Sequence, residues 1–112
     1  MSVNSRDKGA RFERKLASIF RSYGFKDCRR SAQYCGNTGD ASDVVGLPGI
    51  HQEVKRVERL NIEEAMSQAV RDSQGSKIPV VAHRKNGQGW LVTMRAEDWF
   101  SLYREWEAGN EP

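Results

Sequence analysis

Apolar residues recur over residues 10–23 with the spacing of one face of an α-helix. Polar and charged side chains, mostly arginines, occupy the other positions of the helical wheel. The pattern predicts an amphipathic helix whose apolar face packs on the rest of the protein. That face is made by Phe12, Leu16, Ile19, Phe20 and Tyr23.

Three strand-like segments follow this helix. Residues 25–34 read as an irregular strand, and residues 42–45 and 50–57 read as two further strands. The last two are joined by the sequence Gly46-Leu47-Pro48-Gly49, in which the Pro-Gly pair suits a tight turn. We therefore expect these two strands to lie antiparallel and side by side.

The second half of the chain predicts a helix, two strands and a last helix. Asn61 suits an N-cap for a helix through Ser73, and strands at residues 78–83 and 89–94 surround the turn signal Asn86-Gly87. The order αβββαββ plus a C-terminal helix predicts an α/β fold, a mixed sheet flanked by helices. The last helix carries Trp99, Leu102, Tyr103 and Trp106 on one face, which we expect to pack on the sheet or to form a subunit interface.

Two carboxylates and an amine are expected to meet at the predicted antiparallel pair. Its register places Asp43 opposite Val54 or next to it, within a residue of Glu53. Glu53 and Lys55 share one face of their strand, while Val54 points to the other face and into the core. Carboxylates held this close raise each other's pKa unless a cation lies between them.

This grouping predicts a site for Mg²⁺, or for Mn²⁺ in its place, because hard divalent cations prefer oxygen ligands. The matching substrate is a phosphodiester, with Lys55 positioning the attacking hydroxide or contacting the scissile phosphate. A surface hairpin with a cross-strand Glu–Lys pair explains the spacing equally well. Glu13 adds a third acid, since it falls at the border of the apolar face of the first helix, from which a carboxylate can reach a sheet edge.

Successive motifs of the chain resemble those of Holliday junction resolvases of the archaeal type and their phage relatives, within the PD-(D/E)xK nuclease superfamily. The resemblance extends from about Lys8 to about Trp90. It implies a restriction-endonuclease-like core. The motifs are residues 8–16 (KGARFERKL), Arg30-Ser31, Ser42-Asp43-Val44-Val45 and Glu53-Val54-Lys55.

The resemblance also implies roles for individual residues. Glu13, Asp43 and Glu53 would be metal ligands, with the carbonyl of Val54 as a further one, and Lys55 would be the catalytic lysine. Ser31 matches a serine that some members carry before the catalytic strand, and Gln68 falls where related nucleases often have a helical glutamine. Ser42 stands where the proline that names the superfamily is expected.

The chain of 112 residues is expected to be a single nuclease domain, with residues 1–7 and 108–112 flexible. Residues 1–60 hold 12 Lys or Arg and 7 Asp or Glu, whereas residues 61–112 hold 6 and 8. The basic half thus contains the acidic motif, and basic side chains around it would attract a nucleic-acid backbone. The candidate DNA-binding residues are Arg11, Arg14, Arg29, Arg30, Arg56 and Arg59.

Cys28 and Cys35 are the only cysteines, and their spacing indicates reduced thiols rather than a disulfide framework. A zinc site that they share with His51 and His83 is the less favoured alternative, because structural zinc sites usually show closely paired ligands. Without an apolar signal region or a long apolar run, the protein is expected to be cytoplasmic and to have no membrane partner.

The combined prediction is a Mg²⁺-dependent endodeoxyribonuclease for branched DNA such as four-way junctions. A homodimer is expected because one domain offers one acidic cluster, whereas resolving a junction requires cuts in two strands. One alternative is a nuclease for nicked, flapped or linear DNA without junction preference. Another is a DNA-binding module that no longer cuts, and a third is a protein-interaction domain in which the acids meet by coincidence.

Overall fold

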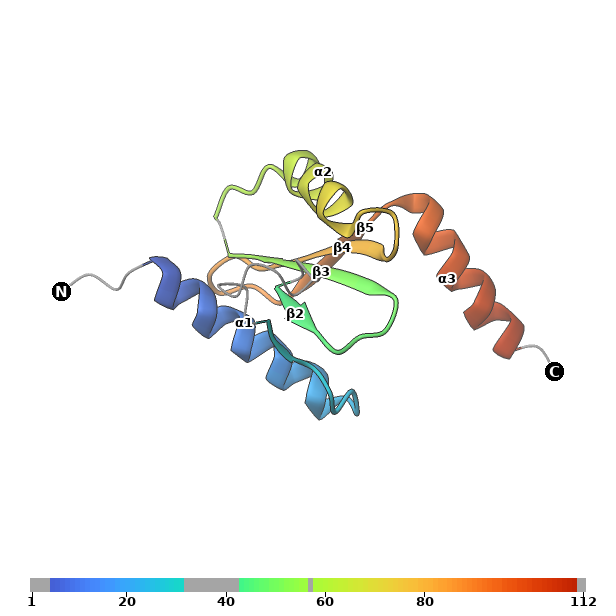
Figure 1. Cartoon of the computed structure of the whole chain (residues 1–112), viewed down its shortest axis with the longest axis horizontal. Coiled ribbons are helices and arrows are strands. Elements are labelled where there is room, and N and C mark those ends of the chain that lie inside the picture. The colour runs from blue at the N-terminus through green and yellow to red at the C-terminus, as the bar shows by residue number, and fades with distance from the viewer. Residues whose placement is uncertain (1–4, 32–42, 57, 111–112) are drawn as a thin grey trace.

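The computed structural model describes residues 5–31, 43–56 and 58–110, and within these ranges five strands form one sheet in the order β1-β2-β3-β4-β5. Neighbouring strands are antiparallel except β3 and β4, which are parallel and connected through α2. The predicted element order and the mixed sheet flanked by helices are confirmed (Figure 1). The elements are α1 (Ser5–Ser22), β1 (Arg29–Arg30), β2 (Val44–Val45), β3 (Ile50–Lys55), α2 (Ile62–Ser73), β4 (Ile78–His83), β5 (Leu91–Met94) and α3 (Ala96–Gly109).

Helices α1 and α2 lie on opposite faces of the sheet (Figure 1). On one face, Phe12 and Leu16 of α1 pack with Val44 and Val54 of the sheet. On the other, alanines of α2 pack on Val81. Because the sheet is covered on both faces, the central strand β3 is buried along residues 51–54, although its sequence is largely polar.

Local turn chemistry sets the register of β2 and β3. The amide of Ile50 donates to the carbonyl of Leu47 at 3.1 Å, with Pro48 and Gly49 in the centre and Gly49 at φ 82°. This is the arrangement of a type II turn, as the Pro-Gly pair predicted. Gly46 is also required, because at its φ of 103° a Cβ atom would lie 2.3 Å from the carbonyl oxygen of Asp27.

The sequence-based prediction agrees with the structure better for α2 than for α1. Helix α2 matches its prediction, and the side chain of Asn61 caps it by accepting a hydrogen bond from the amide of Glu64 at 3.1 Å. Helix α1 begins at Ser5 and so includes residues 5–7, which we expected to be flexible. The assignment of Tyr23 to its apolar face is wrong, since Tyr23 follows the helix and its side chain is exposed.

Four predicted strands are shorter than expected, and two of them are β2 and β3, which cover less than the predicted ranges 42–45 and 50–57. Strand β1 has two residues, and the end of the predicted strand, residues 32–34, lies outside the described residues. Strand β5 begins at Leu91 rather than Gly89, because pairing of His83 with Leu91 leaves seven residues, 84–90, in the connection. Within that connection only Gly87 of the Asn86-Gly87 pair adopts a positive φ, 74°.

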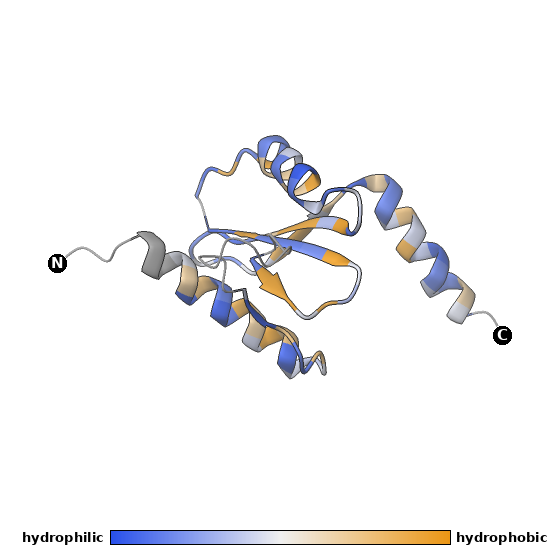
Figure 2. Cartoon of the chain, in the orientation of Figure 1, coloured by the Kyte–Doolittle hydropathy of each residue, from blue (hydrophilic) through white to orange (hydrophobic). Residues whose placement is uncertain are grey.

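The expectation that the last helix packs on its own sheet is wrong. Helix α3 extends away from the sheet (Figure 1) and contains no buried residue. Apolar and hydrophilic residues both occur along it (Figure 2), and Trp99 and Trp106 are 49% and 62% exposed. Its apolar face is therefore uncovered in the single chain. None of the described helices is long and apolar enough to span a membrane.

Candidate active site

Asp43 lies at the start of β2 and is bonded to two neighbouring segments. Its amide donates to the carbonyl of Gln52 at 2.8 Å, and its carbonyl accepts from the amide of Ser31 at 3.0 Å. Its carboxylate oxygen Oδ2 accepts from the amide of Val54 at 2.8 Å. The pairing of Val44 with Gln52 continues by one residue to place Asp43 beside Glu53, within the range that the sequence predicted.

Glu53 is almost completely buried on β3, on the face that α2 covers. The pKa of its carboxyl group is raised to about 7, mainly by burial and in part by the negative charge of Asp43, while a hydrogen bond with His51 opposes the change. Nε2 of His51 and Oε1 of Glu53 are 2.8 Å apart. A buried carboxyl group with this pKa retains a proton more readily than an exposed one, unless a cation replaces that proton.

Glu13 approaches the same place from α1. Burial raises the pKa of its carboxyl group, and so does the charge of Asp43, whereas the guanidinium groups of Arg30 and Arg14 lower it. Nε of Arg30 donates to Oε2 of Glu13 at 3.1 Å. Asp43 acts electrostatically on both glutamates, so the three predicted acids lie in one neighbourhood. Their carboxylate oxygens do not form a group within 4.8 Å of one another; among the described residues, such a group is made by His51, Glu53 and Asp72.

Lys55 and Gln68 form a contact between β3 and α2. Nζ of Lys55 donates to Oε1 of Gln68 at 3.3 Å, in a partly buried environment. Side-chain alternation along β3 places Lys55 on the same face as Glu53, as predicted, and Val54 on the opposite face in the core. Gln68 thus faces the sheet although it lies outside the small apolar stripe of α2.

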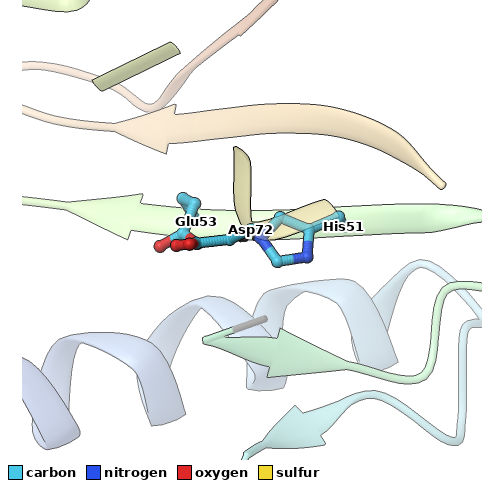
Figure 3. A group of neighbouring side chains, drawn as sticks. All are labelled: His51, Glu53 and Asp72. Carbon is cyan, nitrogen blue, oxygen red and sulfur yellow. Dashed lines mark hydrogen bonds and ion pairs between the residues drawn. The ribbon is translucent and has the colours of Figure 1, made fainter. Parts of the chain in front are cut away.

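Asp72 and His51 join the site without having been predicted as part of it. One ligand atom from each of His51, Glu53 and Asp72 lies within 4.8 Å of the others, and the three side chains approach one another in Figure 3. The signal for His51 was its position two residues before Glu53, on the same face of the strand. Asp72 follows Gln68 by four residues on α2, one helical turn along the same side.

Cys28, the cysteine within the described residues, takes no part in this group. Cys28 is a buried free thiol, as predicted, and Cys35 lies outside the described residues. Among the described residues, the group that could hold a metal ion contains His51 with two carboxylates and no cysteine. The alternative of a zinc site on cysteines and histidines therefore gains no support from the described part of the chain.

The predicted DNA-binding arginines have different surroundings. Arg30 is paired with Glu13, and Arg29 donates to the carbonyl of Asp27 at 3.2 Å. The guanidinium carbon of Arg56 lies 5.4 Å from the centre of the Phe12 ring, and the group also donates to Asn86 at 2.9 Å. The remaining three side chains are exposed: Arg11, Arg14 and Arg59.

The carboxylates, the lysine and their arrangement at neighbouring strands fit a divalent cation bound by oxygen. Glu13 and Glu53 both have raised pKa values in part because of the negative charge of Asp43, so a cation at this point would relieve unfavourable charge. Hard oxygen donors of this kind suit Mg²⁺ or Mn²⁺ better than they suit softer metals. The residues present therefore fit such an ion.

Comparison with known proteins gives one match. No curated protein and no solved structure matches the chain. The profile of a family described as phage putative PDDEXK endonuclease matches residues 4–111, a range that includes every residue of the acidic site. This match covers nearly all of the sequence and agrees with the mixed sheet and with the carboxylates and lysine on it, and the chain belongs to this family of PD-(D/E)xK endonucleases.

Proposed function

We propose that this protein is a metal-dependent endodeoxyribonuclease that hydrolyses phosphodiester bonds in branched DNA, including four-way junctions. The observation that supports this most directly is the electrostatic coupling of Asp43 to both Glu13 and Glu53, next to a strand that also carries Lys55. The three acids come from segments that are far apart in sequence: Glu13 from α1, Asp43 from the start of β2, and Glu53 from β3. The repulsion between their charges would be costly without a cation to offset it.

The metal ligands in this proposal are Glu13, Asp43 and Glu53, with the carbonyl of Val54 as a further ligand. A bound Mg²⁺ or Mn²⁺ ion would lower the pKa of a water molecule and neutralise charge that develops on the phosphorus oxygens. The amide of Val54 already holds the Asp43 carboxylate at 2.8 Å, which fixes one acid relative to the strand of the other.

The remaining residues of the site bind or orient these groups. The ammonium group of Lys55 contacts the scissile phosphate, and Gln68 keeps it in place by accepting its hydrogen bond. His51 is a positioning residue, because it holds one carboxylate oxygen of Glu53. Ser31 supports Asp43 through its main-chain amide, and its hydroxyl group is a candidate contact to DNA.

DNA would reach the site along its basic surroundings. Arg11 and Arg14 are exposed on the helix that carries Glu13, and Arg59 is exposed shortly after β3. Arg29, Arg30 and Arg56 lie next to the same strands and add positive charge near the acids. Phosphate contacts of this kind make affinity depend strongly on salt, since binding releases counterions.

A homodimer would supply the two cuts that a four-way junction needs. The acids of one chain form one cluster, so two symmetric copies provide two sites. The uncovered face of α3 is the surface we assign to the dimer contact, because its large apolar side chains are about half exposed in the single chain. The side chains are Trp99, Leu102, Tyr103 and Trp106.

Cleavage of a labelled four-way junction tests the function. The wild-type protein should nick the junction with Mg²⁺ or Mn²⁺, should stop in EDTA and should recover when the ion is restored. The Glu53→Gln protein should bind the junction without cutting it. Undiminished cleavage in EDTA, or full activity of Glu53→Gln, would contradict the assignment of the acids.

The same assay with other substrates tests junction preference. Nicked, flapped and linear duplexes of equal length are cut in parallel with the junction. Equal rates on all of them would reduce the proposal to a nuclease of broad specificity. Binding without cleavage of any of these substrates, with either metal ion present, would instead indicate a DNA-binding module.

A further inference from the structure

A hollow of about 680 Å³ lies beside the proposed active site, where the segment after β3 meets the connection between β4 and β5. We call it the basic hollow. Its wall contains three cations and several apolar side chains: Arg59, Arg84, Lys85, Leu60, Ile62 and Leu91. None of these cations makes an ion pair with another residue in the described ranges 5–31, 43–56 and 58–110.

The basic hollow is next to the catalytic lysine of the proposed nuclease. The amide of Arg84 donates to the carbonyl of Lys55 at 3.3 Å, and Lys55 is paired with His83 in the parallel ladder. Side chains of paired residues point to the same face of a sheet, so His83, which lines the basic hollow, lies on the face of Lys55. A ligand there would lie close to the scissile phosphate.

The lining combines the two properties that recognise a nucleotide with an exposed base. Three cations against the single carboxylate of Glu58 attract phosphate, and that carboxylate already accepts a hydrogen bond from the amide of Asn86 at 2.9 Å. Leu91 is 63% exposed although it is apolar, and with Leu60 and Ile62 it offers a surface for the face of a base. The volume is within the range of small-ligand sites.

We infer that the basic hollow binds an unstacked nucleotide that flanks the scissile phosphate. This inference rests on the proposed nuclease function and specifies its substrate. A base inside a regular duplex is stacked and paired, so it could enter the hollow only at the cost of leaving the stack. That cost is smallest for a base already unpaired at a branch point or flap. The hollow therefore favours DNA with unpaired nucleotides over plain duplex.

The binding test uses the full chain carrying Glu53→Gln, so that the DNA stays uncut. The DNA is a flapped duplex in which 2-aminopurine replaces the unpaired base next to the branch point. A plain duplex of equal length carries the same probe in the paired region. Protein should change the fluorescence of the unpaired probe in a saturable manner and should leave that of the paired probe nearly constant.

Leu91 and Val92 provide a matched pair of variants. They are neighbours on the edge strand β5, they are 63% and 59% exposed, and their side chains point to opposite faces. Leu91→Glu should weaken binding of the flapped DNA about tenfold and remove the probe signal, because it places a negative charge in the basic hollow. Val92→Glu should retain both the affinity and the signal.

Equal losses of affinity for flapped DNA in Leu91→Glu and Val92→Glu would overturn the inference. A probe signal that persists in Leu91→Glu would overturn it as well. If circular dichroism shows that Leu91→Glu does not fold, the double change Arg84→Ala and Lys85→Ala takes its place. That variant should lose affinity for flapped DNA more than for plain duplex. An equal loss on both DNAs would also overturn the inference.

Cleavage separates this inference from the proposed function. A wild-type protein that cuts no DNA with Mg²⁺ or Mn²⁺ would contradict the nuclease. If the wild type cuts DNA and the Leu91→Glu protein shows the same preference for flapped DNA, the result would contradict the role of the basic hollow but not the nuclease function.

Discussion

Nε2 of His51 lies 2.8 Å from Oε1 of Glu53, and the two side chains are 2% and 5% exposed. The residues are two apart on β3 and therefore project from the same face of the strand. Asp72 of α2 lies next to both. In a site this enclosed, the hydrogen bond holds the Glu53 carboxyl group in one orientation, so that the proposed metal ligand would be fixed before an ion binds.

Replacement of His51 should therefore weaken metal binding more than it slows the chemical step. We expect His51→Ala to reduce the affinity for Mn²⁺ by about 10–100-fold, the usual effect of removing a group that orients a metal ligand. Titration calorimetry with Mn²⁺ measures this affinity, and cleavage rates over a range of Mg²⁺ concentrations show whether saturating metal restores the rate.

His51→Gln is the control for that experiment, since its side-chain amide can still donate to Glu53. It should recover most of the affinity that His51→Ala loses. If His51→Ala and the wild type show the same metal dependence, His51 does not position Glu53. A comparable loss in both variants would point to the imidazole itself as a metal ligand.

Glu53→Gln should stabilise the metal-free protein at high pH. The pKa of Glu53 is about 7 in the folded state, mainly because of burial, against an ordinary value of 4.5. The folded protein thus holds a proton that the unfolded chain releases, and the free energy of unfolding falls as the pH rises from about 4.5 through 7. The loss is on the order of 3 kcal/mol above pH 7.

Thermal denaturation in EDTA at pH 4.5 and pH 8 measures this effect. The variant should melt at a higher temperature than the wild type at pH 8, whereas the two should differ little at pH 4.5. Adding Mg²⁺ at pH 8 should stabilise the wild type and leave the variant unchanged. A variant that is less stable than the wild type at pH 8 would contradict the raised pKa.

Gln68→Ala should slow cleavage without affecting metal binding. Loss of the acceptor at 3.3 Å frees the ammonium group of Lys55 to adopt other positions, and we expect a rate roughly tenfold lower. Lys55→Ala should abolish cleavage while folding and DNA affinity remain largely intact. Ser67→Ala, an exposed neighbour on α2, is the control and should cut normally. If Gln68→Ala cleaves DNA at the wild-type rate, the hydrogen bond between Lys55 and Gln68 does not contribute to cleavage.

Trp106→Glu should convert a dimer to a monomer. The side chain is 62% exposed in the single chain, so the change should not disturb the fold, yet it places a charge in the proposed contact face of α3. Light scattering coupled to gel filtration gives the mass. Ser101→Glu, on the opposite side of α3, should keep the mass of the wild type. A monomeric wild type, or a dimeric Trp106→Glu, would show that α3 does not form the contact.

The sequence by itself determined the structural features that arise from interactions between residues close together in the chain. The Pro48-Gly49 turn sets the pairing of β2 with β3, and that pairing places Asp43 beside Glu53. The cap at Asn61 fixes the start of α2. Alternation along β3 separated Val54, in the core, from Glu53 and Lys55 on the other face. Each of these follows from chemistry within a few residues of the chain.

Contacts between distant segments were decided by the tertiary structure. Asp72 and Gln68 reach Glu53 and Lys55 only because α2 lies over β3 with a particular rotation about its axis, which its small apolar stripe does not determine. The same holds for the basic hollow, which joins the segment after β3 to the connection before β5.

Helix α3 shows the limit of sequence reasoning most clearly. Its aromatic stripe predicted an apolar face that needs a cover, and the structure shows that the sheet of the same chain does not provide it. Periodicity reports which side chains of a helix are apolar, because it reflects local geometry. Which surface they meet depends on the direction in which the chain leaves β5, and that direction is set by packing of the whole fold.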